Sequence, residues 1–253
     1  MDIYSTVLWH LNKPTSLAFL AHDLIKIDKH CHESWIALGN ALSLSNQNSD
    51  ALVAFTKASI VNPYQAYSSV LAGHECIYNE NWDMAINFFQ TAIKIDRRCY
   101  NAWYGLGNVY LNQGNIQMSE EHYKRACEIN STNIVLLCSY ANSIEKSERP
   151  FGIKLQLSLG IYNKAVQLNS NSPLARFKRS NILFQMNRFD EALQDLIYLK
   201  DAAPDEVNVH LLLGKLYRKL SNSAGAAKHF AIAQDIEPKC ATLIGEIIEN
   251  NYK

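Results

Sequence analysis

Hydrophobic and small residues recur along this chain with a period of 34 residues. The first complete set, counted from His32, consists of Trp35, Leu38, Gly39, Ala51, Phe55, Ala58 and Pro63. Further sets begin at Ala66, Tyr100, Ile134, Pro173 and Val207, and together they cover residues 32–238. A period of this length is typical of repeated structural units, and each unit here predicts a pair of helices.

The spacing is the signature of the tetratricopeptide repeat (TPR), a helix hairpin. Small residues at positions 8, 20 and 27 of each unit let two backbones approach, and large residues fill the remaining space. One hairpin cannot bury both of its faces, so neighbouring hairpins must stack. The sequence therefore predicts an all-α fold, a TPR superhelical solenoid of antiparallel helix hairpins with a concave inner surface and almost no strand.

We expect one TPR domain over residues 1–253. It comprises a degenerate N-terminal hairpin (1–31), repeats at 32–65, 66–99, 100–133, 134–172, 173–206 and 207–240, and a C-terminal capping helix (241–253) whose amphipathic stretch runs from Ala241 to Asn250. In the first hairpin, Ile3, Tyr4, Val7, Leu8 and Leu11 form one apolar stripe. We expect a further N-terminal portion to pack before this stripe.

Two departures from the repeat stand out. The fourth repeat keeps Tyr162 and Ala165 in register only if about five residues are added within 147–157, where Pro150 and Gly152 interrupt helical continuity, which predicts an enlarged turn. At position 32, where proline ends the second helix, Arg97, Ser131 and Ser170 stand instead. We expect those helix ends to depend on tertiary packing.

The charge is balanced, with 24 basic and 24 acidic residues. No overall field therefore favours nucleic acid or an anionic membrane. We find neither a signal segment at Met1 nor an apolar run of about 18 residues, and so expect a soluble intracellular protein. The six cysteines include no CxxC pair, so free thiols are expected.

Candidate chemistry is sparse. His30, Cys31 and His32, with His22 upstream, offer metal ligands but lack a second ligand pair at a defined distance, so neither a metal nor another cofactor is expected. The His74-Glu75 pair lacks the second histidine of a metalloprotease, since Tyr78 stands in its place. Because the repeats and flanking helices use the whole chain, no catalytic residues and no enzyme activity are expected.

An RNA-reading repeat protein is a further alternative. Local basic patches lie at Arg176, Lys178, Arg179, Lys215, Arg218 and Lys219. However, an RNA code needs matching side chains at the same position of successive repeats, and the positions here are not uniform. We therefore expect no nucleic-acid partner.

In a TPR hairpin, positions 2, 5, 9, 12 and 13 of the first helix share one inward stripe. Position 9 supplies a ladder of mostly amide side chains, which can bond a peptide backbone in either polarity, and apolar neighbours can accept a side chain. We therefore expect an extended peptide in the groove, although asparagine is frequent throughout the chain. The candidate peptide-binding residues are Asn40, Tyr67, Val70, His74, Glu75, Tyr78, Asn101, Tyr104, Asn108 and Asn142.

A co-chaperone that holds a heat-shock protein's C-terminal carboxylate uses a specific pattern of Lys, Asn and Arg in the groove. The corresponding residues here are Ile36, Asn40, Leu71, Asn101 and Gly105, of which only Asn40 matches. This pattern does not favour a co-chaperone, which remains, with a general TPR adaptor, the alternative assignment.

Several strings resemble one family more closely than they resemble the general repeat. They are IYSTVLWHL (3–11), ESWIALGN (33–40), LAGHE (71–75), YNAWYGLGNVY (100–110), IVLLC (134–138), GKLYRKL (214–220) and DIEPK (235–239). Together they resemble the C-terminal repeat block of the TPR subunit 3 of the anaphase-promoting complex, the cell-division-cycle-27 type. The resemblance runs essentially from Met1 to the last helix.

The resemblance implies a non-catalytic scaffold of this ubiquitin ligase, in the nucleus and cytoplasm, acting in cell division beside other TPR subunits. The implied ligands are the Ile-Arg C-terminal tails of activator and Doc-domain subunits. Asn101 and Asn108 would meet the tail carboxylate and backbone, Glu75 its arginine, and Val70, Tyr67 and Tyr104 its apolar side chain. The family forms a homodimer through earlier N-terminal repeats, which this sequence lacks, so dimerisation of this chain alone is not expected.

Overall fold

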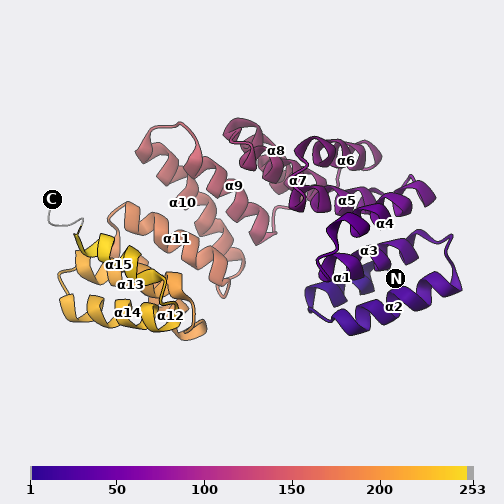
Figure 1. Ribbon diagram of the computed structural model, residues 1–253. Helices are drawn as coiled ribbons and strands as arrows, with labels where there is room; N and C mark the ends of the chain where they lie inside the picture. Colours follow the sequence, from indigo (N-terminus) through magenta and orange to yellow (C-terminus); the bar gives the residue numbers. More distant parts are fainter. Residues whose placement is uncertain (1, 250–253) are drawn as a thin grey trace. The chain divides into compact units, whose positions relative to one another are not determined.

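A computed structural model describes residues 2–249 of the chain, which form fifteen helices and no strand (Figure 1). The helices are α1 (Asp2–His10), α2 (Pro14–Ile27), α3 (His32–Leu44), α4 (Asn48–Val61), α5 (Ala66–Tyr78), α6 (Trp82–Ile95), α7 (Tyr100–Asn112), α8 (Ile116–Ile129), α9 (Ile134–Lys146), α10 (Phe151–Leu168), α11 (Pro173–Gln185), α12 (Phe189–Ala202), α13 (Val207–Lys219), α14 (Ser223–Ile236) and α15 (Cys240–Glu249). The first helix of every predicted repeat begins at the predicted residue.

The helices form two compact units, divided between Ser131 and Thr132. The first unit contains α1–α8 and the second contains α9–α15. The boundary lies just before the fourth predicted repeat, and each unit is described by itself. That the six repeats make one domain over 1–253 stays a prediction.

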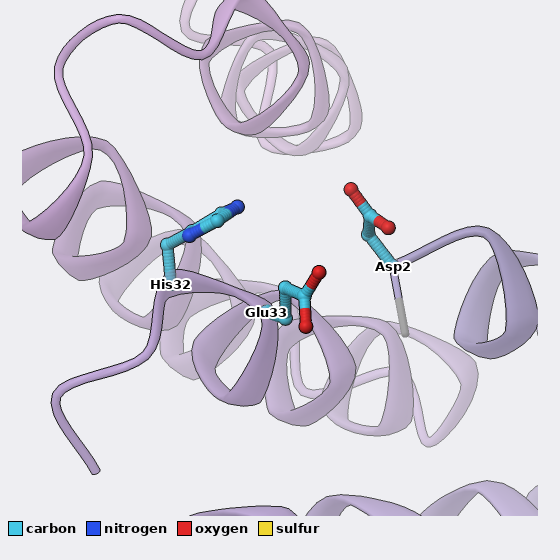
Figure 2. A group of neighbouring side chains, drawn as sticks. All are labelled: Asp2, His32 and Glu33. Atoms are coloured by element: carbon cyan, nitrogen blue, oxygen red, sulfur yellow. The ribbon is translucent and has the colours of Figure 1, made fainter. Parts of the chain in front are cut away.

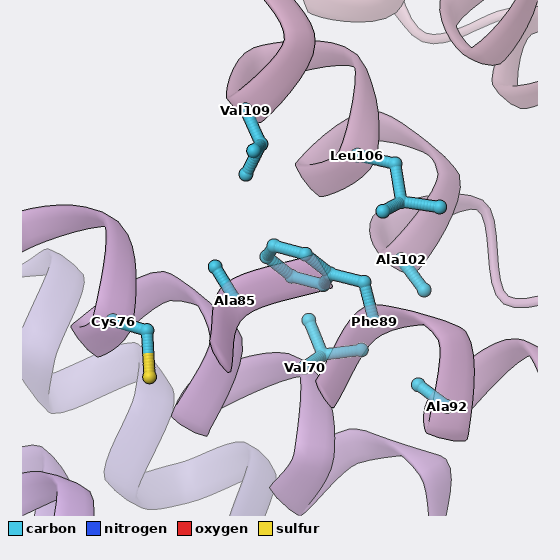
Figure 3. Packing of buried hydrophobic residues seen from close by; sticks show 8 residues of the cluster. All are labelled: Val70, Cys76, Ala85, Phe89, Ala92, Ala102, Leu106 and Val109. Atoms are coloured by element: carbon cyan, nitrogen blue, oxygen red, sulfur yellow. The ribbon is translucent and has the colours of Figure 1, made fainter. Parts of the chain in front are cut away.

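In the first, second, third and sixth repeats, an aromatic side chain at position 24 fills the space that a glycine at position 8 leaves open. Phe89 of α6 is fully buried between α5 and α7, where Val70, Leu106 and Val109 surround it (Figure 3). A methyl group added to Gly73 of α5 would stand 2.7 Å from the Phe89 ring, and one added to Gly105 of α7 would stand 2.3 Å from it. The glycines therefore set the distance between helices.

The turn inside a hairpin repeats its own backbone geometry. Position 15 has a positive φ in five repeats, at Asn46, Glu80, Gly114, Asn187 and Ser221. The next residue donates its N–H back to a carbonyl one turn earlier, as Asn81 does to Cys76 at 2.8 Å. This is the hydrogen bond of a Schellman motif, which ends the first helix and starts the turn.

The turn predicted to be enlarged at 147–157 is nearly normal in length. The connection 147–150 has four residues where the equivalent 45–47 has three, whereas α10 has 18 residues and α4 has 14. The extra residues therefore form an additional first turn of helix. Pro150 precedes this turn, where its missing N–H costs no helical hydrogen bond. Gly152 lies within the turn, and a Cβ added to it would have no atom within 4 Å, so neither residue breaks the helix.

At helix ends that lack proline at position 32, a local hydrogen bond helps to stop the helix. Asp96 accepts the N–H of Arg98 at 2.8 Å, and Asn169 accepts the N–H of Asn171 at 2.9 Å. Each side chain thereby closes an Asx turn directly after its helix. The prediction that these ends depend on tertiary packing did not include this local contribution at α6 and α10.

The two flanking elements differ in their packing. Ile244 and Ile247 of α15 pack on Leu211 and Phe230, as expected for a cap, although Asn250 lies outside the described residues. In α1 the apolar stripe is mostly exposed, with Ile3 78% and Leu11 59% exposed. Ser5 is buried together with Leu8, so α1 faces the rest of the unit with a polar and an apolar side chain.

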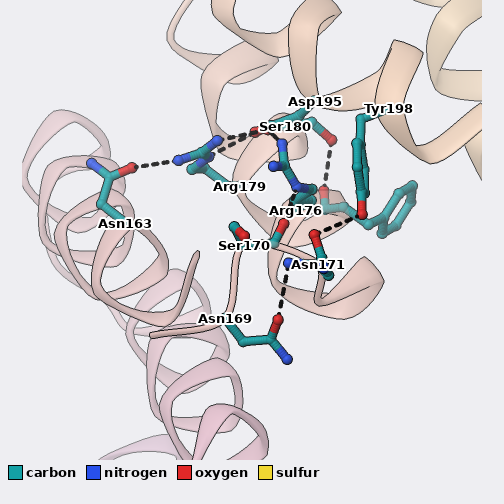
Figure 4. A network of polar contacts seen from close by, with 10 residues as sticks. Asn163, Asn169, Ser170, Asn171, Arg176, Arg179, Ser180, Asp195 and Tyr198 are labelled. Carbon is teal, nitrogen blue, oxygen red and sulfur yellow. Dashed lines mark hydrogen bonds and ion pairs between the residues drawn. The ribbon is translucent and has the colours of Figure 1, made fainter. Parts of the chain in front are cut away.

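An ion-pair network joins α11 and α12 in the second unit. Asp195, which is 1% exposed, accepts from Arg176 at 2.8 Å and from two nitrogens of Arg179 at 2.6 Å (Figure 4). Arg176 also stacks on Tyr198, with its guanidinium carbon 4.1 Å from the ring centroid. Arg176 and Arg179, two members of the predicted basic patches, are therefore paired with a carboxylate of the same unit.

Glycine substitutions test the packing rule. We expect Gly214→Ala to destabilise the protein by about 1–3 kcal/mol, because its methyl group would meet the buried Phe230 ring at 2.4 Å. Gly160→Ala, in the same unit, has no atom within 4 Å of the new methyl group and should stabilise the helix by up to about 1 kcal/mol. Urea unfolding measures both, and equal effects would contradict the packing rule.

Removal of the buried acid tests the network. Asp195→Ala should lower the free energy of unfolding by about 3 kcal/mol, because two arginines lose their shared carboxylate. The exposed Asp205→Ala serves as the control and should change stability by less than about 0.5 kcal/mol. A loss below 1 kcal/mol for Asp195→Ala would show that water replaces the carboxylate.

Candidate functional site

A pocket of about 320 Å³ opens in the first unit on the side formed by first helices of the hairpins. Residues from α1, α3, α4, α5 and α7 line it, so its shape depends on the stacking of successive repeats. Eight of the ten predicted peptide-binding residues lie in its wall: Asn40, Tyr67, Val70, His74, Glu75, Tyr78, Asn101 and Tyr104.

The other two predicted residues do not line this pocket. Asn108 of α7 accepts a hydrogen bond from the Tyr123 hydroxyl at 2.5 Å, which holds its amide against α8. Asn142 belongs to α9 in the second unit. The pocket wall therefore contains predicted residues of the first three repeats and none of the fourth, and their contact with a peptide stays a prediction.

The sequence analysis missed the contribution of α1. Thr6, Trp9 and His10 also line the pocket. These residues occupy positions 9, 12 and 13 when the 34-residue register is extended backwards from His32 into the degenerate hairpin. That extension is the signal that would have found them.

Hydrogen bonds fix α1 across the pocket. The hydroxyls of Thr6 and Tyr67 lie 2.7 Å apart, Asn40 donates to Ser5 at 3.0 Å, and Gln65 donates to Asp2 at 2.9 Å. Asn40 is 4% exposed, so its amide serves mainly to hold α1 rather than to face the opening. Burial raises the pKa of Tyr67, which keeps its hydroxyl neutral.

Glu75 is the one acidic side chain in the wall of the pocket. It is 4% exposed, and its Oε2 atom has no hydrogen-bond partner among the described residues. Burial raises the pKa of Glu75, and a hydrogen bond from Ser43 partly opposes this shift. A buried carboxylate with an unused oxygen is a strong acceptor for a cationic ligand group.

The remaining wall is mostly apolar or neutral. Val70 is buried, Tyr104 packs on Tyr123 with ring centroids 5.7 Å apart, and His74 packs edge-on against Phe89 at 5.2 Å. Burial lowers the pKa of His74 to about 4, so its imidazole is neutral at physiological pH. The pocket therefore presents one acidic side chain in a mostly apolar wall.

The histidine and cysteine cluster predicted from sequence does not assemble as a metal site. Among residues 2–249, one group of three side chains could ligate a metal ion. It consists of His32, Asp2 and Glu33, whose ligand atoms lie within 4.8 Å of one another (Figure 2). His30, Cys31 and His22 are not part of it. One oxygen of Asp2 already accepts from Gln65, so this carboxylate helps to hold α1 in place.

The cysteines are free thiols, as predicted. Burial raises the pKa of Cys76 and of Cys138 to about 11, so neither thiol is an effective nucleophile at neutral pH. Among the described helices, none combines the length and the apolar character that crossing a membrane requires.

Comparisons with known proteins support the repeat assignment. Models of the tetratricopeptide repeat match residues 100–133, the third repeat as predicted, and residues 177–239. Anaphase-promoting complex subunit 3 of Schizosaccharomyces pombe is 39% identical over 99% of this chain and 37% of its own length. Protein bimA of Emericella nidulans is 42% identical over 98% of this chain and 30% of its own length.

Cell division cycle protein 27 homolog B of Arabidopsis thaliana is 37% identical over 94% of this chain and 31% of its own length. The chain thus spans about a third of these relatives. Among solved structures, the APC/C hetero-tetramer Cut9-Hcn1 aligns with a TM-score of 0.80 over 98% of this chain and 48% of that chain, at 16% identity. This likeness supports the TPR fold.

Proposed function

Since this chain belongs by sequence to the family of anaphase-promoting complex subunit 3, we propose that it is a non-catalytic TPR scaffold segment of that ubiquitin ligase. Its pocket in the first unit binds the Ile-Arg C-terminal tails of activator and Doc-domain subunits, and the chain works beside other TPR subunits in the nucleus and cytoplasm. The observation that supports the tail-binding proposal is that Glu75 is buried and that its Oε2 atom has no hydrogen-bond partner among the described residues.

The arginine of the tail supplies what Glu75 lacks. Transfer of a carboxylate from water to an apolar site is costly unless hydrogen bonds compensate it, and one Glu75 oxygen has no such bond. A guanidinium can donate two parallel hydrogen bonds to a carboxylate, whereas an ammonium donates as a point charge. An arginine side chain in this pocket therefore offsets the cost of burying Glu75.

The rest of the tail matches the neutral wall. An isoleucine side chain can pack on Val70, Leu71 and Tyr104, which flank Glu75 in the pocket. Asn101 offers amide donors to the terminal carboxylate and acceptors to the backbone. Asn108, which the resemblance also assigned to the carboxylate, is not part of this proposal because its oxygen is bonded to Tyr123.

Loss of the Glu75 charge should weaken tail binding. We expect Glu75→Gln to reduce affinity for a peptide ending in Ile-Arg by roughly tenfold to a hundredfold, because a charge-assisted pair becomes a neutral one. Fluorescence anisotropy of the labelled peptide measures this, with Glu121→Gln, an exposed change in the same unit, as the control. Peptides ending in Ile-Lys, in Ala-Ala or in an amidated arginine test whether binding requires the guanidinium, the two side chains or the terminal carboxylate.

Two results would overturn the tail assignment. Equal binding of the Ile-Arg and Ala-Ala peptides would show that the pocket does not read the tail, which favours a general TPR adaptor. Equal effects of Glu75→Gln and Glu121→Gln would show that binding lies elsewhere on the chain. A circular dichroism spectrum of each variant checks that the helices remain formed.

The affinity for the Ile-Arg peptide should rise with pH. The pKa of Glu75 is raised in the free protein, and only its charged form attracts the guanidinium, so binding releases a proton. Affinity should increase as pH rises through this raised pKa and level off above it, since His74 is already neutral there. Anisotropy titrations between pH 4.5 and 8 measure the slope, and a slope that persists in Glu75→Gln would assign it to another group.

A further inference from the structure

A second cleft, of about 700 Å³, lies in the second unit between α12, α13 and α14. Its wall includes Lys200 and Asp201 of α12, Tyr217 of α13, and Lys228 and His229 of α14. The tail-binding proposal uses none of these residues, and the repeat signature does not require a polar cluster here. Two histidines at its base determine what the cleft can bind.

His210 and His229 form a chain of hydrogen bonds with a fixed direction. His210 is 3% exposed, and its Nε2 lies 2.9 Å from the carbonyl oxygen of Pro204. A carbonyl can only accept, so Nε2 of His210 carries a hydrogen, and Nδ1 of the neutral ring is an acceptor. Nδ1 of His229, 3.0 Å away, therefore donates to it.

This direction leaves one nitrogen available. His229 is 7% exposed, lines the cleft, and already uses Nδ1 as a donor, so Nε2 of the neutral ring has a free lone pair. One proton can be added at Nε2 without breaking either hydrogen bond in the chain. Tyr217 stacks on the His229 ring, with centroids 5.5 Å apart, and holds it in this orientation.

Positive charges converge on the same ring from two helices. The pKa of His229 is lowered by burial first, and then by the proximity of His210, Lys200 and Lys228. Asp201 is the acidic residue in the wall of the cleft. Its Oδ1 atom lies 3.3 Å from Lys200 Nζ, and its side chain is 70% exposed, so water screens its negative charge. The cleft thus combines lysines of α12 and α14 with a histidine that can accept one proton.

We propose that this cleft binds an oxyanion, a phosphoryl or carboxylate group carried by a partner peptide, between the ammonium groups of Lys200 and Lys228. When the anion binds, His229 takes up a proton at Nε2 and donates it as a third hydrogen bond. The anion offsets the repulsion among these cations, so binding and protonation favour each other. Affinity for the anion consequently rises as pH falls.

Nuclear magnetic resonance of the whole 253-residue chain, with labelled histidine side chains, tests the proposal. The probes are inorganic phosphate and the peptides Ala-phosphoSer-Ala, Ala-Glu-Ala and Ala-Ser-Ala, each acetylated at the N-terminus and amidated at the C-terminus so that no terminal charge remains. We expect phosphate and the two acidic peptides to shift the His229 Nε2 signal toward its protonated position and the neutral peptide to leave it unchanged. The two acidic peptides then show whether phosphoryl or carboxylate is preferred.

Variants separate the charge from the proton. Lys228→Ala should weaken phosphate binding about fivefold, whereas Lys219→Ala, an exposed lysine outside the cleft, should leave it unchanged. His229→Asn should bind Ala-Glu-Ala more weakly and with equal affinity at pH 6 and pH 8, because the glutamate carboxylate stays ionised over this range. Absence of a His229 shift with phosphate, or equal losses in the two lysine variants, would overturn the proposal even if His229→Asn fails to fold.

Discussion

The fold depends on one contact, the packing of the aromatic ring at position 24 onto the glycine at position 8. Phe55, Phe89, Tyr123 and Phe230 meet Gly39, Gly73, Gly107 and Gly214 at distances that no Cβ atom could occupy. This contact brings two helices of a hairpin close together, and Phe89 also reaches Gly105 of the next repeat. The candidate pocket exists because this spacing holds α3, α5 and α7 side by side with their inward side chains aligned.

The buried acids Asp195 and Glu75 and the half-buried Glu145 show how the same chemistry serves different ends. Asp195 accepts hydrogen bonds from two arginines, and Glu145 accepts a hydrogen bond from the hydroxyl of Tyr162, so both stabilise the second unit. Glu75 has a partner for only part of its carboxylate, since Oε2 remains without one. Because a protein rarely leaves a buried charge unpaired, the incomplete pairing of Glu75 points to a ligand rather than to stability.

Two histidine environments make a similar contrast. His74 is held neutral by burial alone and contributes a wall to the pocket of the first unit. His229 is poised by a directed pair of hydrogen bonds and by neighbouring lysines, so its protonation depends on what enters the cleft. Burial lowers the pKa of both histidines, and the lysines near His229 add a repulsion that an anion can offset.

The sequence by itself determined the repeat register, the start of every repeat's first helix and eight members of the pocket, because helical period and small-residue spacing are local properties. Tertiary structure alone decided that α1 closes the pocket through Thr6, Trp9 and His10 and that Asn108 turns to Tyr123. It also decided that the residues inserted near Pro150 lengthen a helix and that Glu75 keeps a free oxygen. Each of these outcomes depends on partners far away in sequence, and a 34-residue pattern carries no information about which partners a polar side chain will meet.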